Sequence, residues 1–173
     1  SLTGLTKIND KPAAEFRKDV GGLSFSDEDA KRIAALPAKE QLEEFRREMK
    51  LANPEFDGTL RPTFENDALV GLAFGTNAVA NIEPIRALPG LVALACEGMD
   101  GKGKLADLAP LKGLKLRSLN VAGNPVADLA PLRDLPLTSL VVRGAVAADL
   151  RPLKGMKLVT LECGFSGVTD LTP

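Results

Sequence analysis

The chain has 173 residues, of which 45% are hydrophobic and 26% are charged, and its formal net charge is -1. This composition is typical of one ordinary globular domain and excludes a largely disordered chain. Basic and acidic residues are also balanced along the chain, with 11 and 13 in residues 1–66 and 11 and 10 in residues 67–173. The balance argues against a nucleic-acid partner, and no apolar run is long enough to predict membrane contact.

The residue types that are missing restrict the chemistry further. The chain contains no His, Tyr or Trp. Without His, neither a Ser–His nor a Cys–His pair can form, and the commonest general base and zinc ligand are absent. We therefore expect no enzyme activity, no cofactor and no metal site. Catalysis by Lys or by carboxylates remains a third hypothesis, which needs a constellation of residues that the sequence does not display.

Three segments precede the regular part of the chain. Residues 1–25 mix Gly, Pro and charges without a period, which predicts a linker or a loosely docked arm. Ser26 followed by Asp29 resembles a capping box and predicts a short helix to about Leu36, ended by Pro37. Apolar residues at helical spacing predict a second helix over residues 38–52.

The charged face of the second predicted helix has two interpretations. It is either a docking face or a solvated face, and the solvated face is preferred because i,i+4 partners such as Glu43–Arg47 account for the charges.

A hairpin is predicted after the second helix, with strands at 59–64 and 68–74 and a turn at 65–67. Pro62 places the first of these strands at a sheet edge, since proline has no N–H to donate.

From Leu69 onward the sequence repeats. The leading leucines are Leu69, Leu91, Leu116, Leu137 and Leu158, at steps of 22, 25, 21 and 21 residues, and apolar residues recur at offsets 0, 3 and 5 from each. A second motif, D-L-x-P-L, follows at offset 12 in 128–132 and 149–153, and at offset 16 in 107–111, which belongs to the longest unit. A period this short predicts a solenoid in which stacked coils share one core.

The repeated motifs resemble leucine-rich repeats. L-x-x-L-x-L is similar to the strand segment of that family, and D-L-x-P-L resembles the short 3₁₀ return segment of its internalin-like subclass. The resemblance implies an α/β solenoid with a parallel β-sheet, 3₁₀ return segments and an N-terminal cap of helices and a hairpin. It also implies a structural ladder in which Asn124, and Asn77 in the first unit, bond the backbone of the next coil.

The amino-acid sequence of residues 30–173 is also similar to repeat arrays of planctomycete-type bacterial proteins, many of which are linked to serine/threonine kinases. That resemblance carries over no catalytic residue. The predicted organisation is an arm (1–25), a cap (26–66) and about five repeats (67–173), the last of them incomplete.

A possible phosphate loop and a possible disulfide both have simpler structural explanations. The segment 98–104 invites a phosphate-loop interpretation, but its glycine spacing is wrong and it lies in the longest repeat, so an insertion loop is favoured. Cys96 and Cys163 hold the same offset three coils apart, roughly 14 Å, which is too far for a disulfide. Free cysteines are compatible with the cytoplasm, while the localisation is left open.

Function is expected on the outward strand positions, predicted at offsets 1, 4 and 6 from each leading leucine. The leading hypothesis is a noncatalytic module whose concave face binds an unidentified protein; the alternative is a structural or regulatory spacer in a kinase-linked protein. A self-complementary end-to-end homodimer through residues 158–173 is a further expectation. The candidate protein-binding residues are Val92, Glu97, Arg117, Asn120, Val141, Arg143 and Glu162.

Overall fold

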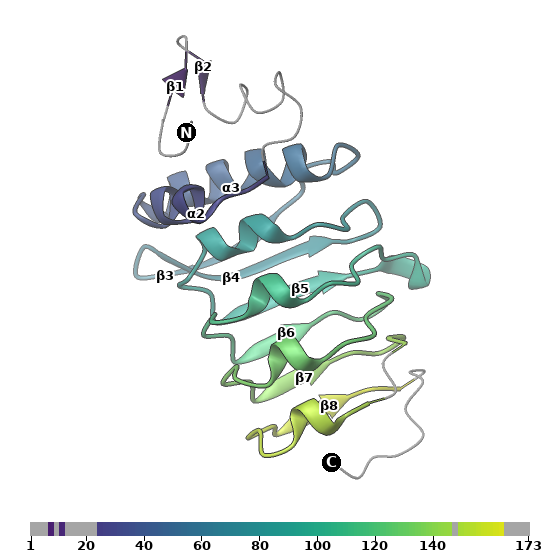
Figure 1. Cartoon of the computed structure of the whole chain (residues 1–173). Helices are drawn as coiled ribbons and strands as arrows, with labels where there is room; N and C mark the ends of the chain where they lie inside the picture. The colour runs from purple at the N-terminus through teal and green to yellow at the C-terminus, as the bar shows by residue number, and fades with distance from the viewer. Residues whose placement is uncertain (1–6, 9–10, 13–23, 147–148, 165–173) are drawn as a thin grey trace.

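The structure is a computed structural model that describes residues 7–8, 11–12, 24–146 and 149–164. Its main body is a six-stranded sheet with strand order β3-β4-β5-β6-β7-β8, and helices α2 (Asp27–Ala34) and α3 (Ala38–Ala52) precede the sheet. The coils stack one below another, with the helices at the opposite end from β8 (Figure 1). The strands are β3 (Arg61–Glu65), β4 (Ala68–Gly75), β5 (Ala93–Glu97), β6 (Ser118–Asn120), β7 (Ser139–Val141) and β8 (Thr160–Glu162).

Strands β4 to β8 run parallel and in register, which confirms the predicted parallel solenoid. Strand β3 pairs antiparallel with β4 and forms the edge of the sheet, as Pro62 predicted.

Most of the predicted arm of residues 1–25 lies outside the described residues. Within it, β1 (Lys7–Ile8) and β2 (Lys11–Pro12) pair as a separate two-stranded sheet.

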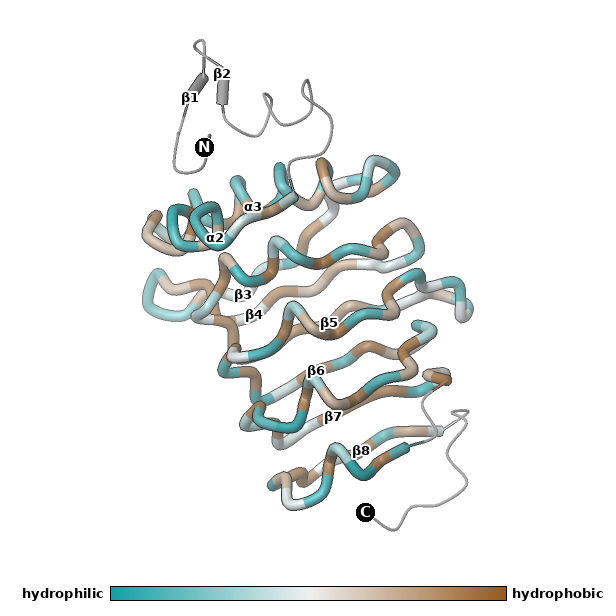
Figure 2. The backbone as a smooth tube through the Cα atoms, in the orientation of Figure 1, coloured by the Kyte–Doolittle hydropathy of each residue, from teal (hydrophilic) through white to brown (hydrophobic). Residues whose placement is uncertain are grey.

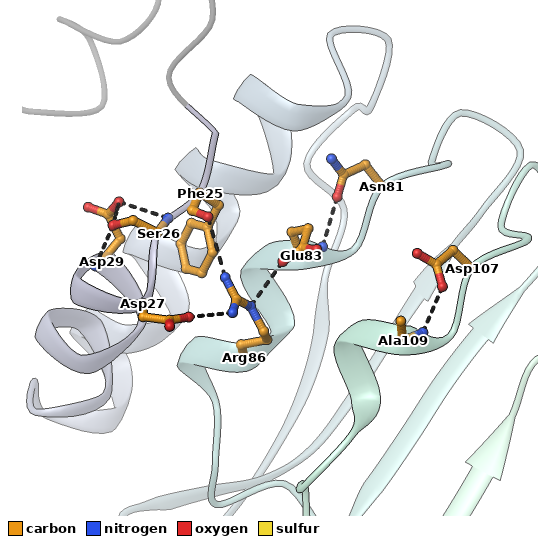
Figure 3. Close-up of polar contacts among 9 residues, drawn as sticks. All are labelled: Phe25, Ser26, Asp27, Asp29, Asn81, Glu83, Arg86, Asp107 and Ala109. Atoms are coloured by element: carbon orange, nitrogen blue, oxygen red, sulfur yellow. Dashed lines mark hydrogen bonds and ion pairs between the residues drawn. The ribbon is translucent and has the colours of Figure 1, made fainter. Parts of the chain in front are cut away.

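Each of the strands β5 to β8 is reached through a short 3₁₀ segment on the other side of the coil. These segments are η1 (Glu83–Ala87), η3 (Ala109–Leu111), η4 (Ala130–Leu132) and η5 (Arg151–Leu153), each with Pro in its first turn. The preceding polar residue caps the segment: the Asp107 carboxylate accepts from the Ala109 N–H at 2.8 Å, and Asn81 does the same for Glu83 (Figure 3). The predicted return segments are therefore confirmed, together with the capping role of Asp107.

The core fills the space between the sheet and the 3₁₀ segments. Leu116, Leu119 and Val121 are each 0% exposed, and the other units from Leu69 to Val142 bury the same three offsets. Hydrophobic positions accordingly recur along every coil of the tube in Figure 2. The unit that contains β8 differs, because Leu161 is 38% exposed whereas its equivalents Leu119 and Leu140 are fully buried.

The helices pack against the first coil. Phe45 and Met49 of α3 are fully buried, and the Phe45 and Phe56 rings each lie 6.2 Å from the Phe74 ring. Ser26 caps α2 through the predicted capping box with Asp29. No described helix is long and apolar enough to cross a membrane.

The exposed charges of α3 pair at a different spacing from the one predicted. Glu43 pairs with Arg46 at 2.5 Å and Glu44 pairs with Arg47 at 2.5 Å, so both contacts are i,i+3 rather than the Glu43–Arg47 i,i+4 contact. Residues three apart are also neighbours on a helix surface, and the side-chain rotamers select between the two spacings. The solvated-face interpretation still accounts for these charges.

Two polar side chains join the helices to the first coil. The buried Asn53 amide donates to the Asn81 carbonyl at 2.7 Å and accepts from the Ala80 and Asn81 N–H groups at 3.0 Å. Arg86 of η1 reaches the Asp27 carboxylate at 2.5 Å and the Phe25 carbonyl at 3.3 Å (Figure 3). These contacts fix the helices on the solenoid in a way that the sequence periodicity did not indicate.

Candidate functional site

The candidate site is the exposed face of the parallel sheet, named here the exposed sheet face. Its middle row follows from the strand register, in which Asn120 lies opposite Ala95 on one side and Val141 on the other. Val141 in turn lies opposite Glu162. Small side chains dominate the row, and no aromatic side chain interrupts it. The row consists of Ala73, Ala95, Asn120, Val141 and Glu162.

The structure brings together most of the predicted site residues. Asn120, Val141 and Glu162 share the middle row, while Glu97 and Arg143 lie exposed beside it at offset 6. Val92 and Arg117 precede β5 and β6, so they lie at the border of the face where the strands begin.

Sequence reasoning missed one row of this face. Side chains alternate along a strand, so offset 2 must share the face with offset 4. The register places this row across the strands, and its members are exposed or half-buried except Gly71. The period-2 rule applied to the sequence would have found it. The row consists of Gly71, Ala93, Ser118, Ser139 and Thr160.

The polar side chains of the face pair with each other between coils. The Asn120 amide donates to the Glu97 carboxylate and its oxygen accepts from the Ala122 N–H at 3.0 Å. Arg143 lies 3.4 Å from Glu162. Val141 lies between these two pairs as a half-buried apolar position. The face therefore combines oriented polar groups with small apolar surface, an arrangement that can make side-chain contacts with another protein.

The structural ladder differs from the prediction. Asn124 is 1% exposed, and its amide donates to the Cys96 carbonyl of the preceding coil at 2.7 Å. Its oxygen accepts from the Thr76 hydroxyl at 2.7 Å and from the Leu105 N–H at 3.2 Å. Asn124 thus bonds the preceding coils, whereas a bond to the next coil was predicted. The loop at 98–103 lies close against Asn124 on that side, since a Cβ on Gly103 would overlap the Asn124 side-chain oxygen.

Asn77 has the same offset as Asn124, but its side chain does not join the buried hydrogen bonds around Asn124. Its side chain is exposed and accepts from the Met99 N–H at 2.9 Å. The buried partner in the first coil is Thr76, one residue earlier. The predicted bond from Asn77 to the backbone of the next coil is present at Met99, but an exposed side chain makes it, whereas Asn124 is buried.

The segment 98–104 is the predicted insertion loop. It contains the short 3₁₀ turn η2 (Met99–Gly101), and no α-helix follows it in the described residues, as a phosphate loop would need. The neck of the loop is closed by backbone bonds from Gly98 N–H to the Ala122 carbonyl at 2.8 Å and from Gly103 N–H to the Gly123 carbonyl at 3.0 Å. The described residues hold no group of three or more His, Cys, Asp or Glu suited to a metal ion.

The two cysteines form no disulfide, and their thiols lie in different environments. Cys96 is fully buried, and burial, with a smaller contribution from the Glu97 charge, raises the pKa of its thiol far above the usual range. Cys163 is only half-buried. The thiolate is the reactive form, so a low thiolate fraction and burial both protect Cys96.

We expect a charged maleimide to label one thiol per native chain, at Cys163, and to label Cys96 only after unfolding. Mass spectrometry of the labelled peptides measures this directly. The Cys163→Ser variant is the control, because it should leave the native chain unlabelled. Rapid native labelling at Cys96 would contradict the buried environment.

No family model matches the chain, and no curated protein matches it. Among solved structures, an internalin C2 from Listeria monocytogenes str. 4b F2365 is similar, with 24% identity and a TM-score of 0.54 over 61% of this chain. The fold is an internalin-like leucine-rich-repeat fold. An internalin (inlF) from the same strain is 24% identical over 59% of the chain, with a TM-score of 0.48.

The chain spans 46% of the length of the first of these structures and 36% of the second. At this level of identity the similarity shows the fold. The predicted fold class is therefore confirmed.

Proposed function

We propose that the chain is a noncatalytic protein-interaction module and that its partner contacts the exposed sheet face. The observation that carries the proposal is the in-register middle row, which spans five parallel strands and stays exposed or half-buried. The pairs Glu97–Asn120 and Arg143–Glu162 orient the polar groups before binding, which lowers the entropic cost of association. Val141 between them is the central apolar contact.

Val141→Arg is expected to weaken binding of a partner by about tenfold or more, because a long charged side chain would occupy the centre of the contact. The partner is first captured by a photo-crosslinking residue at position 141 in the source cells, and its affinity is then measured by calorimetry. Ala130→Arg on η4 is the matched control, since the equivalent position of η5 already holds Arg151. Equal affinity for both variants would contradict the proposal.

The alternative function is a structural or regulatory spacer. It is favoured by the absence of aromatic residues from the exposed sheet face, because aromatic side chains dominate strong interfaces. Its kinase-linked form rests on the sequence resemblance. The spacer predicts that Val141→Arg leaves the activity of a parent protein unchanged while deletion of one whole coil alters it. The same variant therefore separates the two functions.

We also propose end-to-end association of two copies through the coil of β8. The exposure of Leu161, at 38%, and of Val159, at 87%, supports it, while residues 165–173 of the predicted contact lie outside the described residues. We expect sedimentation to show a dimer at high micromolar concentration, and Leu161→Lys to shift the chain toward the monomer. A monomer at every concentration, or a dimer unaffected by Leu161→Lys, would contradict this contact.

A further inference from the structure

Basic residues collect at one edge of the solenoid, where the chain turns from each 3₁₀ segment into the next strand. The turns 112–117, 133–138 and 154–159 contain six Lys or Arg residues and a single acidic residue, Asp134. Because β6, β7 and β8 are parallel and in register, these three turns lie beside one another at the same edge (Figure 1). We name this surface the basic edge. Its residues are Lys112, Lys115, Arg117, Arg133, Lys154 and Lys157.

The charges of the basic edge are free. All six side chains belong to exposed residues. The ion pairs among the described residues involve other cations, such as Arg143 and Arg151, and none involves a member of the basic edge. The carboxylates Asp107, Asp128 and Asp149 instead cap the 3₁₀ segments, which separates them from the basic edge. Stacking therefore concentrates positive charge in a chain whose net charge is only -1.

Fold stability explains only half of the set. Lys112, Arg133 and Lys154 each follow the last residue of a 3₁₀ segment, where a cation interacts favourably with the free carbonyl groups. Lys115, Arg117 and Lys157 lie beyond these segments and gain nothing from them. Six like charges in adjacent coils, with strands about 4.8 Å apart, repel one another. A bound anionic partner would relieve that repulsion.

The surroundings of the basic edge indicate which anion fits. The same edge continues to the turn before β4, where Glu65 and Asp67 are exposed, so the positive surface is confined to three coils. A nucleic acid carries regular charge along its whole length, and its strands would run into this acidic turn. No aromatic side chain is present in the three turns to stack on a base. A protein segment with a few clustered carboxylates matches the short patch.

We propose that the basic edge is a second interaction surface, which binds an acidic segment of a protein. It lies at the border of the exposed sheet face, and the proposal stands without the function assigned to that face. Association through such a surface depends mainly on charge, so it weakens as salt rises. Val92 and Val159, both exposed beside the starts of their strands, supply nearby apolar contacts.

The test uses the full chain and a short fluorescent oligoglutamate peptide, followed by anisotropy at about 50 mM and about 200 mM salt. We expect binding at low salt that weakens severalfold at high salt. The variant Lys115→Glu, Lys154→Glu, Lys157→Glu should lose about tenfold or more in affinity. The control Lys31→Glu, Lys39→Glu, Lys102→Glu makes the same change of net charge at exposed residues elsewhere and should bind within about twofold of the unaltered chain.

Three results would overturn the proposal: no binding of the peptide at low salt, an equal loss in the control variant, or tighter binding of duplex DNA or of phosphatidylserine vesicles than of the peptide. Circular dichroism melting of both triple variants confirms that they fold. The variant Val141→Arg should leave peptide binding unchanged, so a failure of the exposed sheet face and a failure of the basic edge remain distinguishable.

Discussion

Asn124→Ala is expected to lower the free energy of unfolding by about 3–4 kcal/mol, since the substitution removes the partner of several buried groups at once. The Cys96 carbonyl, the Leu105 N–H and the Thr76 hydroxyl would all lose a hydrogen bond. None can turn to water, because Asn124 and Thr76 are 1% and 0% exposed. Chemical denaturation followed by circular dichroism measures the change.

The matched control is Asn77→Ala. Asn77 has the same offset in its repeat, but it is exposed, and its hydrogen bonds within the described part of the chain go to the Met99 backbone. Its removal should cost about 0.5 kcal/mol or less. Equal losses for the two variants would show that the buried ladder is not what holds the first three coils together.

Gly123→Ala is expected to lower the free energy of unfolding by about 4 kcal/mol. Gly123 has φ of 71°, a conformation that costs a residue with a Cβ about 1–2 kcal/mol. A Cβ at this position would also overlap the Gly98 carbonyl oxygen, which belongs to the neck of the loop 98–103. Backbone must then shift, and such overpacking adds about 1–3 kcal/mol.

Gly144→Ala separates these two costs. Gly144 occupies the same place one coil later with φ of 73°, but a Cβ there would meet its nearest atom at an ordinary 3.6 Å. We expect a loss of only about 1–2 kcal/mol, from the backbone conformation alone. Denaturation of Gly75→Ala, which has open space and no positive φ, should show almost no change. A Gly123 variant as stable as the Gly144 variant would rule out the close approach of Gly98.

The sequence predicted those parts of the molecule that depend on local pattern. Leu116, Leu119 and Val121 could be placed in the core from their spacing, because the coils must bury the same offsets to stack. Asp107 could be placed as a cap, because it precedes its proline-containing turn at a fixed distance. Both relations lie within one repeat, and a repeat can be read without knowing what lies beside it.

The candidate site was predicted only in part. The middle row of the exposed sheet face followed from the strand alternation, yet the row that contains Ser118 and Ser139 was missed. The pairing of Glu97 with Asn120 and of Arg143 with Glu162 joins residues of different repeats. Such contacts depend on the register between coils, which the sequence of a single repeat does not contain.

By itself, the sequence determined the solenoid, its parallel sheet and its 3₁₀ return segments, because five repeats of one apolar pattern have a single way to share a core. Only the tertiary structure decided that Asn124 is buried while Asn77 is exposed. The backbone of the loop 98–103 lies against Asn124 at Gly103, whereas Asn77 meets the same loop at the exposed residue Met99. Only stacking gathered Lys112, Arg133 and Lys154 into one basic edge. Along the sequence, basic and acidic residues are balanced. In the folded chain, the in-register coils bring these three cations side by side, with adjacent strands about 4.8 Å apart.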